Sequence, residues 1–247
     1  LMQGILQHRA TIAVTSPTSY RAMAALPSPQ SPSTQGPSAP HPLRGSALRE
    51  CVSAGEALPA ATRTLWRQAT GLEMLDGIGS TELLHIFVSA PSKESVPGAT
   101  GRAVPGYEAK VVDDKGHEVP DGTVGRLAVR GPTGCRYLSD ARQSNYVQGG
   151  WNLTGDAYRR DAQGFFHYVS RTDDMIVSSG YNIGAPEVED ALMAHPAVAE
   201  CAVIGVPDEE RGQIVKAFVV LRPGLSGDAT MVSALQEHVK ATIAPYK

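Results

Sequence analysis

The sequence is poor in cysteine, has no long apolar run and carries little net charge, and each property argues against a class of protein. Its three cysteines, Cys51, Cys135 and Cys201, are far apart and include no Cys-x-x-Cys pair, which argues against a zinc site. A sparse, odd set of cysteines is typical of reduced thiols in a cytoplasm, where we expect this protein. No apolar run approaches the ~20 residues that a membrane span needs. The formal net charge of −3 gives no electrostatic reason to bind nucleic acid or an anionic membrane, so we expect neither as a partner.

Two compositional patterns divide the chain, and the change falls near residues 171–174. Before this boundary, glycine turns separate apolar segments that predict short strands at 10–15, 108–112, 126–130 and 165–169. The first of these is expected to be buried and to end at Pro17. Residues 27–43 are rich in proline and serine and predict a low-complexity loop.

After the boundary, the pattern becomes compact α+β. It predicts a helix that begins at Pro186 and stops before Pro196, followed by strands at 199–206 and 214–221. A second helix is predicted from Asp228, with Val232, Leu235 and Val239 on one face.

Residues 76–82, Asp-Gly-Ile-Gly-Ser-Thr-Glu, combine backbone freedom with groups that suit a bound nucleotide. Glycines let the backbone turn sharply and approach a ligand closely. Hydroxyls and exposed amides suit phosphate oxygens, and a carboxylate suits Mg²⁺. The motif predicts a nucleotide-phosphate and metal site, and a plain turn is the alternative for such a segment on its own.

Later segments favour the first interpretation. They read Trp-Asn-Leu-Thr-Gly-Asp at 151–156, Arg-Thr-Asp-Asp-Met-Ile-Val at 171–177, Ser-Ser-Gly-Tyr-Asn at 178–182 and Pro-Glu-Val-Glu at 186–189. In this order and spacing they resemble the adenylate-forming superfamily, which includes acyl-CoA synthetases, luciferases and the adenylation domains of peptide synthetases. Residues 53–59 and 76–87 are similar to the benzoate and 2-aminobenzoate CoA ligases of that superfamily. The resemblance covers residues 5–24 and 46–247.

The resemblance implies an α/β and α+β fold. Residues 1–172 would be the C-terminal part of the large, strand-rich domain, and residues 173–247 a truncated α+β lid domain. The implied activity is that of an acid–thiol ligase that joins an aromatic carboxylate to CoA through acyl-AMP, using ATP, Mg²⁺ and CoA. A homodimer is left open as the assembly. The superfamily's phosphate loop and a lysine of its small domain do not occur in this sequence, and residue 1 is not methionine, so we expect a fragment that is inactive alone.

The resemblance also implies roles for individual residues. Thr81 would contact the α-phosphate, and Glu82 would bind the Mg²⁺ that neutralises charge as pyrophosphate leaves. The backbone of one short strip would run along the adenine, and a second strip would line the adenine and carboxylate pocket. These strips are Gly55, Glu56 and Ala57, and Asp76, Gly77, Ile78 and Gly79.

Further roles concern the ribose and the lid. Asp156 would accept hydrogen bonds from both ribose hydroxyls, and Arg171 would lie on the ribose and phosphate side. Asp173 would be the hinge about which the small domain turns. The loop that swings in for thioester formation would contain Ser179, Gly180 and Tyr181.

The residues alone leave alternatives open. A helix-start cap is the alternative for Thr81, a surface turn for Asp156, and a solvated acidic pair for Asp173 with Asp174. We expect His85 to pack beside the acyl pocket, and His167 and His195 to be structural. For the function, the alternatives are an adenylation domain that loads a carrier-protein thiol and a truncated homologue without catalytic activity.

Overall fold

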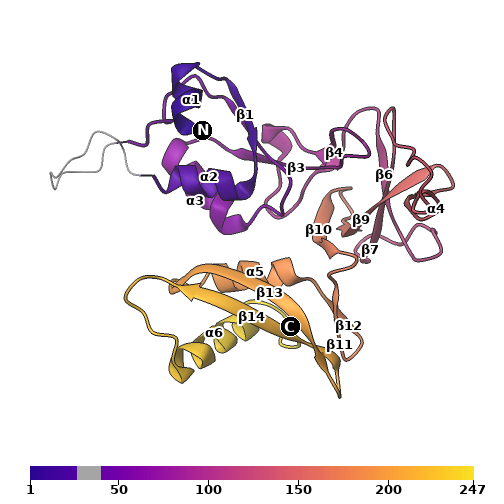
Figure 1. The fold of residues 1–247 in the computed structure, drawn as a ribbon. Coiled ribbons are helices and arrows are strands. Elements are labelled where there is room, and N and C mark those ends of the chain that lie inside the picture. Colours follow the sequence, from indigo (N-terminus) through magenta and orange to yellow (C-terminus); the bar gives the residue numbers. More distant parts are fainter. Residues whose placement is uncertain (27–39) are drawn as a thin grey trace.

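Residues 1–26 and 40–247 are described by the computed structural model, in which three sheets form the framework (Figure 1). The first sheet has the order β1-β2-β3-β4-β5. Its strands are β1 (Ile12–Thr15), β2 (Glu50–Ser53), β3 (Met74–Gly79), β4 (Ile86–Ser89) and β5 (Arg102–Ala103). The first three run parallel, and β4 and β5 are antiparallel to their neighbours. Three helices accompany this sheet: α1 (Met2–Gln7), α2 (Pro17–Ala24) and α3 (Ala60–Thr70). Trp66 of α3 and Tyr20 of α2 are fully buried in their common core.

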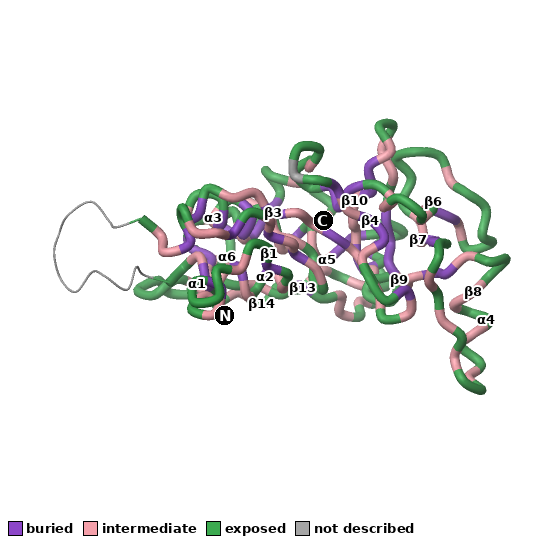
Figure 2. The backbone as a smooth tube through the Cα atoms, turned by 90° about the horizontal axis from the view of Figure 1, so that it is seen from above, coloured by how far each residue is buried: buried purple, intermediate pink, exposed green. Residues whose placement is uncertain are grey.

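The second sheet is antiparallel and has the order β10-β9-β7-β6. Its elements are β6 (Glu108–Val112), β7 (Gly125–Arg130), α4 (Gln143–Tyr146), β8 (Val147–Gln148), β9 (Trp151–Arg160) and β10 (Phe166–Arg171). A short 3₁₀ turn, Ser92–Glu94, lies upstream of it. Phe87 of β4 belongs to the same buried cluster as Leu127 and Tyr158 of this sheet. The first two sheets therefore share a core, and Figure 2 shows buried segments along β4, β9 and β10.

The third sheet has the order β12-β11-β14-β13 and a core of its own. It consists of β11 (Ile176–Ser178), β12 (Tyr181–Ile183), β13 (Val198–Asp208) and β14 (Gly212–Leu221), with helices α5 (Ala185–Met193) and α6 (Ala229–Thr242). α5 lies on the side that faces the rest of the chain (Figure 1). The predicted boundary falls in the connection between β10 and β11, and the division into domains at this point stays a prediction.

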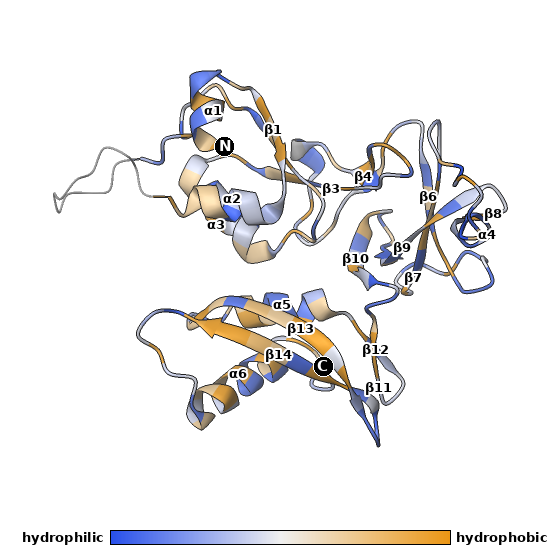
Figure 3. Ribbon diagram, in the orientation of Figure 1, coloured by the Kyte–Doolittle hydropathy of each residue, from blue (hydrophilic) through white to orange (hydrophobic). Residues whose placement is uncertain are grey.

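Many elements agree with the sequence predictions, but two predictions were wrong in detail. Strand β1 is not uniformly buried: Ile12 and Val14 are more than half exposed while Ala13 is buried, because alternate side chains of a strand point to opposite faces of the sheet. β1 ends before Pro17 as predicted, and Pro17 is also the first residue of α2. In α6 Val232 is half exposed, and Met231 packs with Leu235 on the sheet instead. Figure 3 shows how apolar residues gather along β1, β13 and β14.

The end of the proline-rich segment is anchored in the core. Residues 27–39 lie outside the described part of the chain, so the predicted loop is open to comparison only at residues 40–43. There Leu43 is almost completely buried beside Trp66, so this end of the predicted low-complexity loop is packed into the core. The imidazole Nε2 of His41 donates a hydrogen bond to the carbonyl oxygen of Met23 at 3.0 Å, and Nδ1 accepts one from the backbone N–H of Leu43. The end of α2 and the start of the next described segment are thereby held together.

Candidate nucleotide-binding site

A cavity of about 1590 Å³ lies where the three sheets meet. Its wall includes residues of the β3–β4 connection, of β9 and β10, and of α5, the helix that packs with the third sheet. Every residue predicted to bind the nucleotide lines it: Gly55, Glu56, Ala57, Asp76, Gly77, Ile78, Gly79, Thr81, Glu82, Asp156 and Arg171. The chain therefore brings segments that are distant in sequence to one place, while the role of each residue stays a prediction.

The motif at 76–82 connects β3 to β4 through a tight turn. No helix begins at Thr81; the Oγ of Ser80 accepts a hydrogen bond from the backbone N–H of Leu83 at 3.3 Å, and the chain enters β4 three residues later. The helix-cap alternative for Thr81 is therefore wrong. Gly79 is required for this turn, because a Cβ atom there would lie 2.5 Å from the carbonyl oxygen of His85. His85 itself is exposed and does not line this cavity, and its packing beside the acyl pocket stays a prediction.

Asp76 is a carboxylate at the base of the cavity. Its Oδ1 accepts a hydrogen bond from the backbone N–H of Gly77 at 3.0 Å. Burial raises the pKa of Asp76 to about 6, against the opposing effects of that hydrogen bond and of the nearby Arg63 guanidinium. The Arg63 guanidinium donates to the carbonyl oxygen of Met74 at 3.0 Å, and its Nε lies 3.5 Å from Glu73. This part of the wall is thus acidic but poorly solvated.

Glu82 has a hydrogen-bond partner from another segment. The hydroxyl of Tyr137, in the connection between β7 and α4, donates to Glu82 Oε1 at 2.7 Å. This donation is the main reason why the pKa of Glu82 is lowered, and it raises the pKa of Tyr137 to about 12. Glu82 is therefore held as an anion at the cavity wall.

Asp156 and Arg171 face each other across two strands. They are direct partners in the pairing of β9 with β10, and Arg171 Nη1 lies 3.3 Å from Asp156 Oδ1. Because Gly155 has φ +79° and no side chain, the guanidinium can lie against its backbone. Asp156 is 8% exposed and lies within β9, so the surface-turn alternative is wrong. Burial raises its pKa, and Arg171 opposes that effect.

The residues predicted to form the hinge and the thioester loop do not line the large cavity. Asp173 lies in the connection to the third unit, 3.3 Å from Arg171 Nε, and borders a second cavity of about 460 Å³. Ser179 and Gly180 form the two-residue turn between β11 and β12, both with positive φ. Tyr181 stacks on Tyr246, with ring centroids 4.4 Å apart. The interpretation of Asp173 and Asp174 as a solvated acidic pair stays open, since Asp173 is largely exposed.

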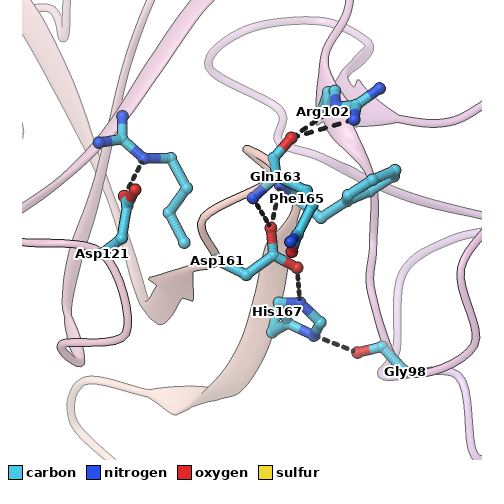
Figure 4. A network of polar contacts seen from close by, with 8 residues as sticks. Gly98, Arg102, Asp121, Asp161, Gln163, Phe165 and His167 are labelled. Atoms are coloured by element: carbon cyan, nitrogen blue, oxygen red, sulfur yellow. Dashed lines mark hydrogen bonds and ion pairs between the residues drawn. The ribbon is translucent and has the colours of Figure 1, made fainter.

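Polar contacts fix the turn between β9 and β10, which shortly precedes the cavity-lining His167. His167 lines the cavity, but its ring nitrogens already contact Asp161 Oδ2 at 2.8 Å and the carbonyl oxygen of Gly98 at 3.1 Å (Figure 4). Arg102 donates to the carbonyl oxygen of Gln163 in the same turn. These contacts support the prediction that His167 is structural. His195 likewise accepts from the backbone N–H of Ala197.

Sequence reasoning missed several residues of the cavity wall. Tyr137 and Tyr146 pack edge to face with centroids 5.6 Å apart, and the buried Tyr146 hydroxyl has no partner among the described residues. The two tyrosines follow Gly131 and precede Trp151, but they belong to no motif that would have marked them. Glu187 of α5 forms a salt bridge with Lys247, and both residues line the cavity.

The carboxylates that line the cavity suit a metal ion that is also bound by oxygens of a nucleotide. Among the described residues, no three His, Cys, Asp or Glu side chains gather closely enough to hold a metal ion by themselves. Mg²⁺ usually takes one or two carboxylates and completes its shell with phosphate oxygens and water. The anionic, partly exposed Glu82 fits that requirement.

In the described parts of the chain, no helix is both long and apolar enough to cross a membrane.

Comparison with known protein families shows to which family this chain belongs. Residues 1–137 match the family described as AMP-binding enzyme, and residues 187–247 match the AMP-binding enzyme C-terminal domain. The chain belongs to the AMP-binding enzyme family. This confirms the predicted kinship with adenylate-forming enzymes.

Two relatives illustrate the similarity within the AMP-binding enzyme family. A mitochondrial acyl-coenzyme A synthetase of Homo sapiens is 41% identical over 209 residues, which covers 81% of this chain and 36% of that protein. Benzoate–CoA ligase of Thauera aromatica is 40% identical over 203 residues, which covers 81% of this chain and 38% of the relative. The chain thus spans less than half the length of these relatives.

Solved structures of AMP-binding enzymes have the same architecture. An anthranilate CoA ligase in complex with anthranoyl-AMP superposes with a TM-score of 0.85 at 39% identity, covering 98% of this chain and 45% of that one. A benzoate CoA ligase from Burkholderia xenovorans gives a TM-score of 0.83 at 38% identity, covering 100% and 47%. The predicted fold class, a strand-rich part of the large domain followed by a small α+β lid, is confirmed.

Proposed function

We propose that this chain is part of an ATP-dependent, AMP-forming aryl-CoA ligase of the benzoate or 2-aminobenzoate type. One observation carries the proposal: the carboxylates of Asp76, Glu82 and Asp156 come from separate strands or loops and line a single cavity together with Thr81 and Arg171. Such a combination of acceptors, a hydroxyl donor and a cation matches the ribose, phosphate and metal parts of a bound nucleotide. Support for the aromatic acid comes from the similar benzoate–CoA and anthranilate CoA ligases.

In this proposal the chain's own residues bind and orient the nucleotide. Asp156 accepts hydrogen bonds from the ribose hydroxyls, and the guanidinium of Arg171 keeps that carboxylate in place. The hydroxyl of Thr81 donates to the α-phosphate. The backbone at 55–57 and 76–79 borders the adenine, and Ile78 covers one side of it by apolar contact. Glycine at 77 and 79 lets this backbone approach the ligand closely.

Glu82 would hold the Mg²⁺ of the nucleotide, which when bound neutralises charge on the departing pyrophosphate. The remaining steps depend on positioning. The substrate carboxylate attacks the α-phosphate to form acyl-AMP, and the CoA thiol then displaces AMP from the mixed anhydride. The second step needs only the closeness of thiol and anhydride, so no covalent enzyme nucleophile is required.

We further propose that residues 173–247 form a lid that turns about Asp173 and that Ser179, Gly180 and Tyr181 approach the cavity for thioester formation. The positions of these residues outside the cavity are consistent with a part that must move. A cytoplasmic location also belongs to this proposal, although the similar human protein is mitochondrial. A homodimer is the assembly that belongs to this proposal.

The test uses the protein as encoded, with any flanking sequence retained. ATP–pyrophosphate exchange is measured with benzoate, 2-aminobenzoate, 4-hydroxybenzoate and, as an aliphatic control, hexanoate, and CoA thioesters are then sought by mass spectrometry. We expect exchange with an aromatic acid and formation of its CoA thioester. Pyrophosphate exchange followed by transfer of the acyl group only to the pantetheine arm of a carrier protein, and not to CoA, would favour the carrier-loading alternative. A folded protein without exchange would favour the non-catalytic homologue.

A further inference from the structure

The connection between β7 and α4, residues 131–142, is bonded to the Glu82 segment at two points. Tyr137 donates to the Glu82 carboxylate at 2.7 Å, and the hydroxyl of Thr133 donates to the carbonyl oxygen of Leu83 at 2.7 Å. Leu83 itself is fully buried in the core shared by the first two sheets. The connection is therefore anchored beside Glu82 and does not merely pass near it.

Tyr137 is fixed by its own neighbours. Its backbone N–H donates to the side-chain oxygen of Gln143 at 2.7 Å. The ring of Tyr146 meets its ring edge to face, and the guanidinium of Arg142 lies 5.1 Å from its ring centroid. Arg142 is held in turn by two hydrogen bonds to Asp140. A phenol with this many contacts is a defined donor and not one of several side-chain conformers.

We propose that Tyr137 is a positioning residue that orients the Glu82 carboxylate for the Mg²⁺ of a bound nucleotide; this inference rests on the proposed function. A glutamate has several rotatable bonds, and a flexible carboxylate loses conformational entropy when it binds a metal. The hydrogen bond to Oε1 fixes the carboxylate in advance. A carboxylate accepts at both oxygens, so the second oxygen is still available to the metal.

An opposite effect is conceivable on chemical grounds, and it makes the inference testable. If the hydroxyl competed with the metal for the carboxylate, its removal would tighten metal binding. If it orients the carboxylate, its removal weakens metal binding. Changes to groups that orient a metal ligand commonly weaken metal affinity by roughly 10–100-fold.

The experiment compares Tyr137→Phe with wild type in the protein as encoded. Mn²⁺, which has an electron paramagnetic resonance signal, replaces Mg²⁺, and its affinity is measured with saturating ATP and without turnover. We expect a loss of roughly 10–100-fold in Mn²⁺ affinity, with little change in ATP binding without metal. Raising the Mg²⁺ concentration should recover most of the pyrophosphate exchange. Unchanged or tighter Mn²⁺ binding would overturn the inference.

Two matched variants distinguish orientation of the Glu82 carboxylate from a general destabilisation of residues 131–142. Tyr107→Phe removes a hydroxyl that contacts Thr133 at the base of the same connection but does not contact Glu82, so we expect wild-type Mn²⁺ binding. In a Glu82→Gln background, Tyr137→Phe should have no further effect, because the group that it orients is gone. Additive effects of the two changes would contradict the inference even if Tyr137→Phe lowered stability.

Failure of the inference is distinguishable from failure of the proposed function. If wild type binds Mn²⁺ with ATP and Tyr137→Phe binds it equally well, only the role of Tyr137 is refuted. If folded wild type binds no nucleotide at any Mn²⁺ concentration, the proposed function itself fails, and with it the inference.

Discussion

Asp76 should destabilise the protein at neutral pH, and replacing it with asparagine should therefore stabilise the fold. Burial raises its pKa from 3.8 to about 6 in the folded state. Each unit of pKa shift corresponds to about 1.4 kcal/mol, so the charged form costs the fold about 3 kcal/mol at pH 7.5. Asparagine keeps an oxygen that accepts from the backbone N–H of Gly77, but it carries no charge. For a chain of this size, 3 kcal/mol corresponds to a rise in melting temperature of roughly 6–12 °C.

The sign of the pH dependence follows from the direction of the shift. Below about pH 4 the carboxyl is protonated in both the folded and the unfolded state, so Asp76→Asn should gain little. As the pH rises towards 6, the unfolded chain releases this proton while the folded chain retains it, and wild type loses stability relative to the variant. Above that pH the difference is constant.

Thermal unfolding at pH 4, 5, 6 and 7.5 without nucleotide measures this directly. Asp114→Asn, at an exposed position in the turn between β6 and β7, is the matched control and should show no such trend. An equal effect of Asp76→Asn at pH 4 and pH 7.5, or a loss of stability at pH 7.5, would refute the reasoning.

Three other substitutions test separate parts of the structure. Glu82→Gln should slow pyrophosphate exchange by about 10²–10³-fold while ATP binding without metal changes little, because the carboxylate matters most where charge develops; a wild-type rate at saturating Mg²⁺ would contradict the metal assignment. Asp173→Pro should leave acyl-AMP formation intact in single-turnover assays and block thioester formation, because proline fixes a backbone dihedral at the proposed hinge; equal loss in both halves, or the same effect from Asp173→Ala, would argue against a hinge. Leu43→Ala should lower the free energy of unfolding by about 2–5 kcal/mol in urea titrations, because Leu43 is almost fully buried; Leu84→Ala, at a position 76% exposed, is the control and should cost far less.

Regular strands and capped helices were predictable from local pattern. The strands at 108–112 and 126–130 are present almost as predicted, because each contains apolar residues that include valine and has glycines close to both ends. Asp228 begins α6 as predicted, and its carboxylate accepts from the backbone N–H of Met231 at 2.9 Å. Such features depend on residues a few positions apart, which a sequence displays directly.

Features that depend on distant contacts were not predictable in the same way. Nothing local marks Leu43 as a core residue, since its burial depends on Trp66 of α3. Val232 is exposed because a different side of α6 packs on the sheet. Apolar residues lie on two neighbouring sides of this helix, so its sequence alone does not show which side is buried. In the candidate site, Tyr137 and Glu82 are 55 residues apart in the chain, and a single tyrosine in a loop carries no periodic signal. Family resemblance located several residues that line the cavity, but not Tyr137, which donates a hydrogen bond to Glu82.

The bond between His41 and Met23 has a consequence for how this protein can be modified. It ties together the two chain ends that flank residues 27–39, so the chain length between them does not determine where those ends lie. A peptide tag or a small reporter domain inserted between residues 27 and 39 should therefore leave the core around Trp66 and the distant cavity undisturbed, and this position offers a place to attach a probe that tests the proposed movement of residues 173–247.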